Sequence, residues 1–174
     1  MTPELYDIDG YPVDGGLMDI RLGAVDPGVR CRTCGGRLKE CLGHPGRIDM
    51  ARPVIHLKYV PLIEMGLRCF CHECGKIMLS EKDAAKYNPT ERAKRSKDIK
   101  RCPHCSAPHE KIKLDKPTSF QIGKKRIFPT EIREILVKIP NEELKKIGVN
   151  PIAARPEWAV LTALLVPAVT VRPS

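Results

Sequence analysis

The sequence predicts an α+β fold made of small, irregular lobes with short strands and short helices. Three observations support this prediction. The 174 residues include 16 prolines and 13 glycines, which interrupt long helices and strands. Aromatic residues make up only 5% of the chain, so each lobe can bury only a modest core. Eight cysteines are present, and small lobes of this kind usually depend on disulfides or bound metal for stability.

Seven of the cysteines and one histidine fall in four pairs, CRTC, CLGH, CHEC and CPHC, each with two residues between the paired side chains. This spacing lets a tight turn direct both side chains at one ion, with sulfur about 2.3 Å from zinc. A structural zinc site has four ligands, so two pairs complete one site. Grouping neighbouring pairs predicts two zinc sites. The first set is Cys31, Cys34, Cys41 and His44, and the second is Cys71, Cys74, Cys102 and Cys105.

Disulfides and chance spacing are the alternatives to zinc for the first set. A redox function is the main alternative for the second set, because CPHC, with Cys102 and Cys105, resembles the active-site motif of some thioredoxin-fold oxidoreductases. That motif follows a strand and opens a helix, whereas the approach here, SKDIKRCPHC, is basic and not apolar. A catalytic zinc usually keeps an open position for water, and both predicted sets are complete at four ligands. We therefore favour structural zinc and predict no catalytic residue.

Four side chains near these pairs are not predicted to be ligands. His72 and His104 lie inside the CxxC loops and are expected to point outwards. His56, in PVIHLKYV, alternates with apolar residues as on the face of a strand. Cys69 lies two residues before Cys71 and is expected to be a small buried thiol.

The first half of the chain predicts loops, a strand region and a basic insert. Residues 1–30 are rich in Asp, Gly and Pro, as in a surface loop or an ordered loop that packs on a partner. PVIHLKYVPLI, residues 53–63, is apolar and β-branched enough for one or two strands. Residues 75–101 hold nine Lys or Arg against four Asp or Glu, a net charge of +5 by subtraction.

This basic insert allows two interpretations. ERAKRSKDIKR has no apolar stripe, which is typical of a solvated helix or loop. The whole chain carries a net charge of +9, which favours an acidic partner such as nucleic acid. Contact with phosphates is therefore the alternative interpretation. The predicted DNA contacts are Arg92, Lys94, Arg95, Lys97, Lys100 and Arg101.

The second half predicts short strands followed by two helices. KIKLDKPTSF and KKRIFP are typical of short strands and turns. PTEIREILVKIP has apolar residues at helical spacing, with Thr130 as the predicted N-cap and Pro140 as the stop. NEELKKIGVNP predicts a second helix between Asn141 as N-cap and Gly148 as C-cap. The segment EWAVLTALLVPAVTVRPS is apolar and predicts a strand.

These elements suggest three consecutive segments. Residues 1–57 would hold the N-terminal loop and the first zinc set, and residues 58–117 the second zinc set with the basic insert. Residues 118–174 would hold the short helices and the apolar strand segment. The N-terminus MTPELYDIDGYPVDGG lacks the apolar core of a signal peptide, and no run of 18 apolar residues occurs. We therefore expect a cytoplasmic, reducing location, where paired cysteines are more often metal ligands than disulfides.

Three long stretches resemble a known family. DGGLMDIRLGAVDPGVRCRTCGG, ECLGHPGRIDMARPVIHL and ARPEWAVLTALLVPAVTVRPS are similar to the N-terminal part of the largest subunit of multisubunit DNA-directed RNA polymerase, most of all its archaeal A-prime form. The resemblance extends over nearly the whole chain in the same order. It implies the N-terminal part of the clamp, the mobile lobe that closes over DNA, with the family's zinc ligands at the eight predicted positions. The family usually has Pro at Leu42 and a second His at Arg47, and neither position is a predicted ligand.

The resemblance also implies a function in transcription. The expected partners are other polymerase subunits, especially the second-largest, double-stranded DNA, and initiation and elongation factors, without a membrane. The expected location is the cytoplasm with the nucleoid, and the expected cofactors are two structural Zn²⁺. The nucleotidyltransferase signature NADFDGD, which holds the catalytic Mg²⁺, is absent, so we expect the chain to be inactive alone and to be a fragment, a split gene product or an expressed piece of a longer protein. A stand-alone zinc-ribbon regulator that binds nucleic acid or protein is the alternative.

Overall fold

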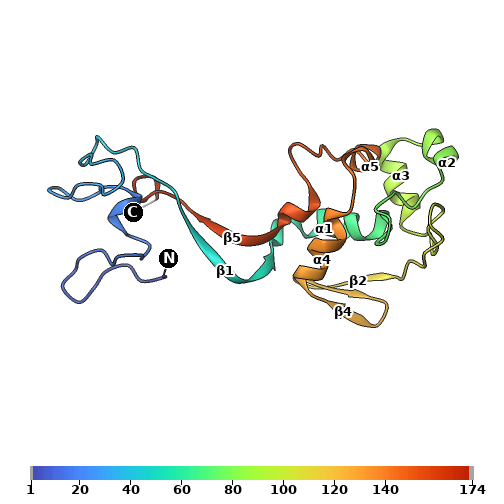
Figure 1. The fold of residues 1–174 in the computed structure, drawn as a ribbon, viewed down its shortest axis with the longest axis horizontal. Helices are drawn as coiled ribbons and strands as arrows, with labels where there is room; N and C mark the ends of the chain where they lie inside the picture. The colour runs from blue at the N-terminus through green and yellow to red at the C-terminus, as the bar shows by residue number, and fades with distance from the viewer. Residues whose placement is uncertain (1, 173–174) are drawn as a thin grey trace. The chain divides into compact units, whose positions relative to one another are not determined.

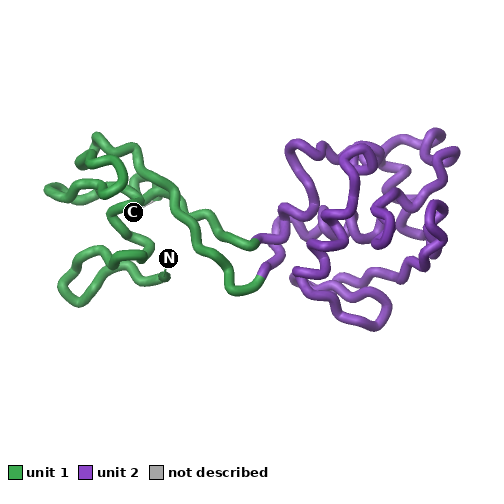
Figure 2. The backbone as a smooth tube through the Cα atoms, viewed as in Figure 1, with its two compact units in different colours: residues 1–52, 162–174 green, residues 53–161 purple. Residues whose placement is uncertain are grey.

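The computed structural model describes residues 2–172 (Figure 1). The backbone forms two compact units, residues 1–52 with 162–174 and residues 53–161 (Figure 2). Unit 1 thus contains both ends of the chain, whereas the predicted segments 1–57, 58–117 and 118–174 are consecutive. Those segment boundaries stay a prediction. The α+β fold class with short elements is confirmed.

Unit 1 consists mainly of turns. It contains two 3₁₀ helices, η1 (Ile20–Leu22) and η4 (Val169–Val171). Leu22, Val166 and Val169 form a small buried core. The N-terminal loop is ordered by Asp7, whose Oδ1 accepts hydrogen bonds from the amides of Asp9 and Tyr11 over 3.0 and 2.8 Å.

Two longer strands pair in a two-stranded sheet. They are β1 (Gly46–Ile55) and β5 (Val160–Val166), and the boundary between the units falls within both strands. The predicted C-terminal strand segment is therefore confirmed, and its partner lies more than a hundred residues earlier in the chain.

Unit 2 holds the helices and a three-stranded sheet. The strands β2 (Ile112–Asp115), β3 (Ser119–Ile122) and β4 (Lys125–Ile127) form an antiparallel meander, which confirms the predicted short strands. Two 3₁₀ helices, η2 (Leu57–Tyr59) and η3 (Pro156–Ala159), flank the helical part. The α-helices are α1 (Val60–Cys69), α2 (Glu81–Lys86), α3 (Pro89–Ser96), α4 (Pro129–Val137) and α5 (Asn141–Lys146).

The core of unit 2 lies where α1, α4 and the sheet meet. Ile63 and Leu67 of α1, Leu136 of α4 and Phe120 of β3 are fully buried there. Gly66 allows α1 and α4 to approach closely, because a Cβ at this position would lie 2.6 Å from Leu136 Cδ2. Burial of these side chains is the main source of stability that the sequence itself supplies to this unit.

The prediction of strands across residues 53–63 is only partly correct. Residues 53–55 end strand β1, but helix α1 begins at Val60. Pro61 lies in the first helical turn, where its missing N–H removes no hydrogen bond. Val60, Ile63 and Leu67 are three and four residues apart, which is helical spacing. The stretch taken for strands ends at residue 63, so it leaves out Leu67 and does not show this spacing.

The two predicted helices of the second half are confirmed, with different N-caps. Helix α4 begins at Pro129, and the N-cap is Phe128, whose amide donates to Glu131 Oε2 over 2.8 Å. Helix α5 begins at Asn141, with Pro140 as N-cap. Both predicted N-caps are therefore wrong. Pro129 has a preset φ and opens α4, which moves the N-cap to Phe128. In α5 the side-chain oxygen of Asn141 accepts from Arg155 and caps no helix amide.

The predicted C-terminal glycine of α5 behaves as expected. Gly148 has a φ of 81°, and its amide donates to the carbonyl of Lys145 over 3.0 Å. The next amide, from Val149, donates to the carbonyl of Leu144 over 3.1 Å. These two bonds form a Schellman motif and satisfy carbonyls at the end of the helix.

Candidate metal centres

The structure brings each predicted set of four side chains together. Within each set, one sulfur or ring nitrogen per residue lies within 4.8 Å of the other three. The first set lies in unit 1 and the second in unit 2. All eight cysteines are free thiols, so the disulfide alternative receives no support. Two clusters that could each hold a metal ion are therefore present.

Three of the four pairs adopt the same backbone turn. The amide after the second cysteine donates to the carbonyl of the first cysteine, over 2.8 Å from Gly35, 3.0 Å from Gly75 and 2.9 Å from Ser106. These three residues have φ angles of 74°, 69° and 59°. The left-handed conformation costs glycine little, so the two glycines suit the turn better than the serine does. The turn directs both sulfurs of a pair to the same side.

Backbone amides around the sulfurs favour the thiolate form. Burial opposes ionisation of Cys31, but the amides of Cys34 and Thr33 donate to its sulfur, and its pKa falls to about 6. The amide of Ala107 donates to Cys105 in the same way and lowers the pKa of that thiol to about 7. These hydrogen bonds favour the metal-binding thiolate at one cysteine of each set, whereas burial raises the pKa of Cys71 and raises that of Cys74 to about 12.

The sulfur positions of the second set fit a tetrahedral ion. Cys71 Sγ lies 3.5 Å from Cys105 Sγ, and Cys74 Sγ lies 3.7 Å from Cys102 Sγ. Four sulfurs about 2.3 Å from a central zinc would be about 3.8 Å apart at the corners of a tetrahedron. Each short contact joins two different pairs, and the next helix after CPHC is α4 at Pro129. This arrangement does not support a redox function for Cys102 and Cys105.

The first set contains a buried nitrogen that lacks a partner. His44 Nε2 is buried and makes no hydrogen bond within residues 2–172. Buried polar atoms are nearly always satisfied, so an unpaired imidazole nitrogen in a histidine grouped with three cysteines indicates a metal ligand. The His44 amide donates to the carbonyl of Leu22 over 3.0 Å, and Thr170 Oγ1 donates to the carbonyl of Leu42 over 3.0 Å. These bonds hold the CLGH turn against η1 and η4.

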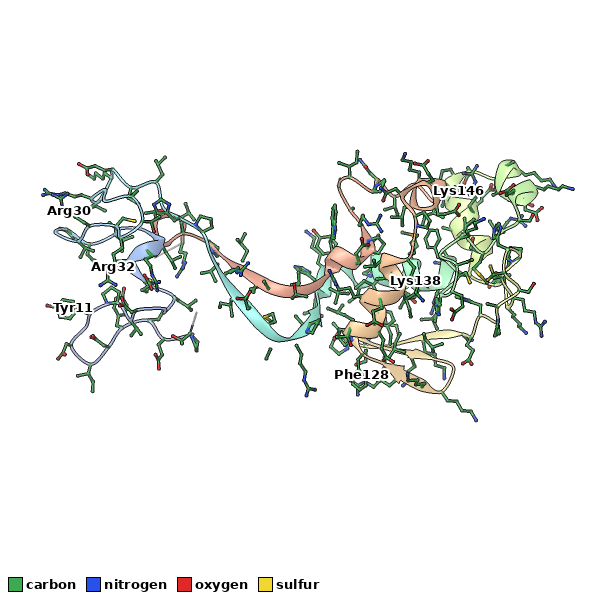
Figure 3. All side chains as sticks on the ribbon, viewed as in Figure 1. Tyr11, Arg30, Arg32, Phe128, Lys138 and Lys146 are labelled. Atoms are coloured by element: carbon green, nitrogen blue, oxygen red, sulfur yellow. The ribbon has the colours of Figure 1, made fainter. Side chains whose placement is uncertain are left out.

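The second set is anchored to the helices by contacts that the sequence did not predict. The amide of Ile77, just beyond the CHEC turn, donates to Glu143 Oε2 of α5 over 2.8 Å. Gly75 packs so tightly on the carbonyl of Lys138 that a Cβ would clash with it. Lys138, labelled in Figure 3, donates from Nζ to the carbonyl of His72 over 3.2 Å. The junction of α4 and α5 therefore positions the CHEC turn.

The histidines inside the loops do not point outwards as predicted. His72 Nε2 lies 2.8 Å from the carbonyl of Leu67, and His104 Nε2 lies 3.0 Å from the carbonyl of Leu79. Both rings are partly buried, and burial lowers the pKa of His72. The prediction is wrong because each backbone carbonyl offers a partner that keeps the ring against the core.

The other two side chains near the pairs have structural roles. Cys69 is fully buried, as predicted, and its Sγ lies 3.3 Å from the carbonyl of Ala93. Burial raises the pKa of this thiol to about 11. His56 follows β1 directly, and its Nδ1 accepts a hydrogen bond from the amide of Lys58 over 3.2 Å, which caps η2.

The predicted DNA contacts divide into two groups. Arg92 donates to the carbonyls of Ala84 and Lys146 over 2.6 and 3.1 Å, which ties α3 to α2 and α5. Arg95 lies over the ring of Tyr87, 4.1 Å from its centroid. Lys94, Lys97, Lys100 and Arg101 are exposed and form no ion pair within residues 2–172. DNA contact by any of these six residues stays a prediction.

Comparison with known proteins identifies the family. Residues 1–174 match the family described as RNA polymerase Rpb1, domain 1. The chain belongs to this family. The Rpb1 domain 1 match covers the whole chain, including both candidate metal sets, and it confirms the resemblance that the sequence indicated.

Archaeal relatives of this Rpb1 domain 1 chain are similar over its full length. It is 46% identical over 189 residues to DNA-directed RNA polymerase subunit Rpo1N of Methanothermobacter thermautotrophicus, covering 100% of the chain and 22% of the relative. The identity to subunit Rpo1N of Methanocaldococcus jannaschii is 45% over 194 residues, covering 100% of the chain and 14% of the relative. The identity to subunit Rpo1N of Thermococcus celer is 44% over 198 residues, covering 99% of the chain and 22% of the relative.

The Rpb1 domain 1 chain therefore corresponds to the N-terminal part of the largest RNA polymerase subunit of archaeal type and spans about a fifth or less of the length of these relatives. Among residues 2–172, no helix combines the length and apolar character that crossing a membrane requires.

Proposed function

We propose that this chain is a zinc-binding segment of the RNA polymerase clamp that takes part in DNA-templated transcription. The observation that carries the proposal is that a chain matching Rpb1 domain 1 over its whole length brings eight ligand-type side chains into two closed sets. In this proposal each set binds one Zn²⁺, through Cys31, Cys34, Cys41 and His44 in unit 1 and through Cys71, Cys74, Cys102 and Cys105 in unit 2.

Zinc would have a structural role in both sets. Thiolate and imidazole ligands in a tetrahedral arrangement suit zinc, and four protein ligands leave no position for a reacting water. When bound, zinc supplies folding energy, on the order of 10–16 kcal/mol apparent per site. The chain's own residues shape the turns around the ligand pairs, provide thiolates and keep the ligand atoms together.

The segment would help to hold double-stranded DNA and to dock other subunits, especially the second-largest, and transcription factors. A net charge of +9 favours contact with phosphates, and the exposed Arg101 of the basic insert would provide one such contact. Nucleotidyl transfer belongs to the whole polymerase, and we assign no catalytic residue to this chain.

Metal analysis and co-purification test this proposal. The purified chain is expected to contain two zinc ions, measured by mass spectrometry of its elements. A native-like chain without zinc would contradict the metal assignment. Affinity purification from the source cells is expected to yield the second-largest polymerase subunit as well. A chain that retains zinc and purifies alone would instead favour the stand-alone zinc-ribbon regulator.

A further inference from the structure

A groove of about 770 Å³ lies on unit 2 beside the second metal set. Residues at the end of α3 and in the segment 97–100 line it on one part, and residues 109–112 line it on another. These two segments lead into and out of the CPHC turn. The groove is within the usual size range of ligand pockets, about 300–1,000 Å³.

The walls of the groove are fixed by hydrogen bonds. The amide of His109 donates to the carbonyl of Lys100 over 2.8 Å, and Arg101 and Pro108 form an antiparallel bridge. Arg68 of α1 donates from Nη2 to the carbonyl of Ile112 over 3.0 Å. The lining is therefore preorganised, which reduces the entropy lost when a ligand binds.

The charges that line the groove are mostly positive, and four of the five cationic side chains form no ion pair within residues 2–172. Lys94, Lys97, Lys100 and Lys111 are exposed, and none forms an ion pair within residues 2–172. Arg68 also lines the groove and pairs with Glu64 over 2.9 Å. Five cationic side chains against two carboxylates leave a net charge of +3 in the lining. Such a surface attracts an anionic ligand.

The lining also contains apolar side chains and carboxylates, and these help to decide which class of anionic ligand fits the groove. Ile99 and Ile112 lie among the lysines, and Asp98 and Glu110 contribute the two carboxylates. The groove lining has no Phe, Tyr or Trp on which a nucleic-acid base could stack. A duplex presents its phosphates on a wide convex surface that meets only the rim of a groove, and the carboxylates would repel a continuous row of phosphates.

We propose that this groove docks an acidic, extended segment of a partner protein. An extended peptide directs alternate side chains to opposite sides, so acidic side chains can meet the lysines while apolar ones face Ile99 and Ile112. The inference names a partner class for the docking role proposed above and rests on that role. It also assigns to one surface two residues that the sequence did not single out, Arg68 and Lys111.

A peptide-binding measurement tests the inference. The probe is a fluorescein-labelled hexapeptide of alternating glutamate and leucine, titrated with the zinc-loaded full chain and followed by fluorescence anisotropy. The groove variant carries Lys97→Glu, Lys100→Glu and Lys111→Glu. The matched control carries Lys58→Glu, Lys82→Glu and Lys124→Glu, which change the net charge equally at exposed sites of the same unit outside the groove.

The groove variant is expected to bind the peptide at least about tenfold more weakly, and the control variant within about twofold of the unchanged chain. If the groove variant has a lowered melting temperature, the same three lysines are changed to glutamine and the titration is repeated. Equal weakening in both variants would show an effect of overall charge and overturn the inference. So would equal binding of a hexapeptide with glutamine in place of glutamate.

Two further results would also overturn the docking of a peptide. The first is an absence of peptide binding up to millimolar concentration. The second is tight binding of a short DNA duplex that only the groove variant loses, because the groove would then serve nucleic acid. Zinc content and co-purification with polymerase are measured separately, so a failure of this inference is distinguishable from a failure of the proposed function.

Discussion

At the scale of single residues, Asp19 connects the N-terminal loop to η1 through a buried carboxylate. Its side chain is only 2% exposed and accepts hydrogen bonds from the amides of Gly15 and Arg21 over 2.5 and 2.8 Å. The guanidinium of Arg21 also donates to it and holds the pKa of this carboxyl well below its usual range. Because the folded pKa is depressed, the stabilisation is full above the unfolded pKa of about 3.9 and is lost as the pH falls further.

We expect Asp19→Asn to lower the free energy of unfolding by about 1–3 kcal/mol at pH 7, since buried donors lose a charged acceptor. The difference from the unchanged chain should shrink as the pH falls below about 4. Denaturant unfolding at a series of pH values measures this difference in the free energy of unfolding. Both proteins lose metal as the pH falls, so comparing them at the same pH removes that common effect. Asp14→Asn, which removes an exposed pair with Arg32, serves as the control with a loss of about 0–1 kcal/mol. A pH-independent difference for Asp19→Asn would contradict the assignment.

The residue after each CxxC pair provides a second prediction. Ser106 occupies the left-handed position that Gly35 and Gly75 occupy in the matching turns. Ser106→Gly should therefore raise the free energy of unfolding by up to about 1 kcal/mol, because the left-handed strain of about 1–2 kcal/mol is partly offset by glycine's entropy. Gly75→Ala should lower it by more than that strain alone, since the new Cβ would also clash with the carbonyl of Lys138. Thermal unfolding of the zinc-loaded proteins checks both signs, and a stabilising Gly75→Ala would contradict the turn geometry.

At the scale of elements, α5 supports the second metal set through Glu143. One oxygen accepts the buried amide of Ile77, and the other pairs with Lys146 over 2.5 Å. Glu143→Ala should cost about 1–3 kcal/mol, because the Ile77 amide then remains buried without a partner. It should also speed the release of zinc from the second set to a chromogenic chelator. Glu142→Ala, which removes an exposed pair with Lys145, should change neither quantity measurably.

The outcome for Glu143→Gln makes this prediction more specific. The amide oxygen of glutamine can still accept from Ile77, whereas the charge that pairs with Lys146 is lost. We therefore expect zinc release close to that of the unchanged chain. If glutamine and alanine accelerate release equally, the hydrogen bond to Ile77 does not position the CHEC turn.

The features that can be predicted from the sequence are those determined by residues close together in the chain. The ligand sets follow from the spacing of CRTC, CLGH, CHEC and CPHC, because a tight turn is determined by adjacent residues. Helices α4 and α5 follow from apolar spacing and from Gly148. Glu143 was not predictable, because its contact with Ile77 joins residues 66 positions apart. The inward orientation of His104 also depends on a distant carbonyl, that of Leu79, 25 positions earlier. His72 contacts the carbonyl of Leu67, only five positions earlier, but that contact depends on how the chain turns after α1.

At the scale of the whole molecule, local sequence patterns do not predict which segments of the chain form unit 1. Its two parts, residues 1–52 and 162–174, are adjacent only in the folded chain. Within this unit, Gly43 packs directly on Thr170, and Arg172 donates to the carbonyl of Leu17 over 2.6 Å. The sequence shows that the last segment is apolar, but the partner of an apolar strand is set by tertiary packing. The consecutive segments expected from the sequence reflect this limit.

Each candidate metal set lies entirely within one unit, so each unit would have its own metal-dependent stability. We expect Cys41→Ser to reduce the metal content from two ions to one and to unfold unit 1, because the site supplies on the order of 10–16 kcal/mol apparent. Amide hydrogen exchange should then accelerate in residues 17–44, while Ile63 and Leu136 stay protected. Cys105→Ser should give the reverse pattern, with exchange accelerated in unit 2.

Cys69→Ser is the matched control for these two variants. Cys69 is a buried cysteine that lies outside both sets, and a serine hydroxyl can donate to the carbonyl of Ala93 as the thiol does. The variant should therefore retain two metal ions even if its melting temperature falls. If Cys69→Ser loses an ion, or if Cys41→Ser retains both, the ligand sets are wrong. If either ligand variant accelerates exchange equally in both units, the two metal sets do not stabilise the units separately.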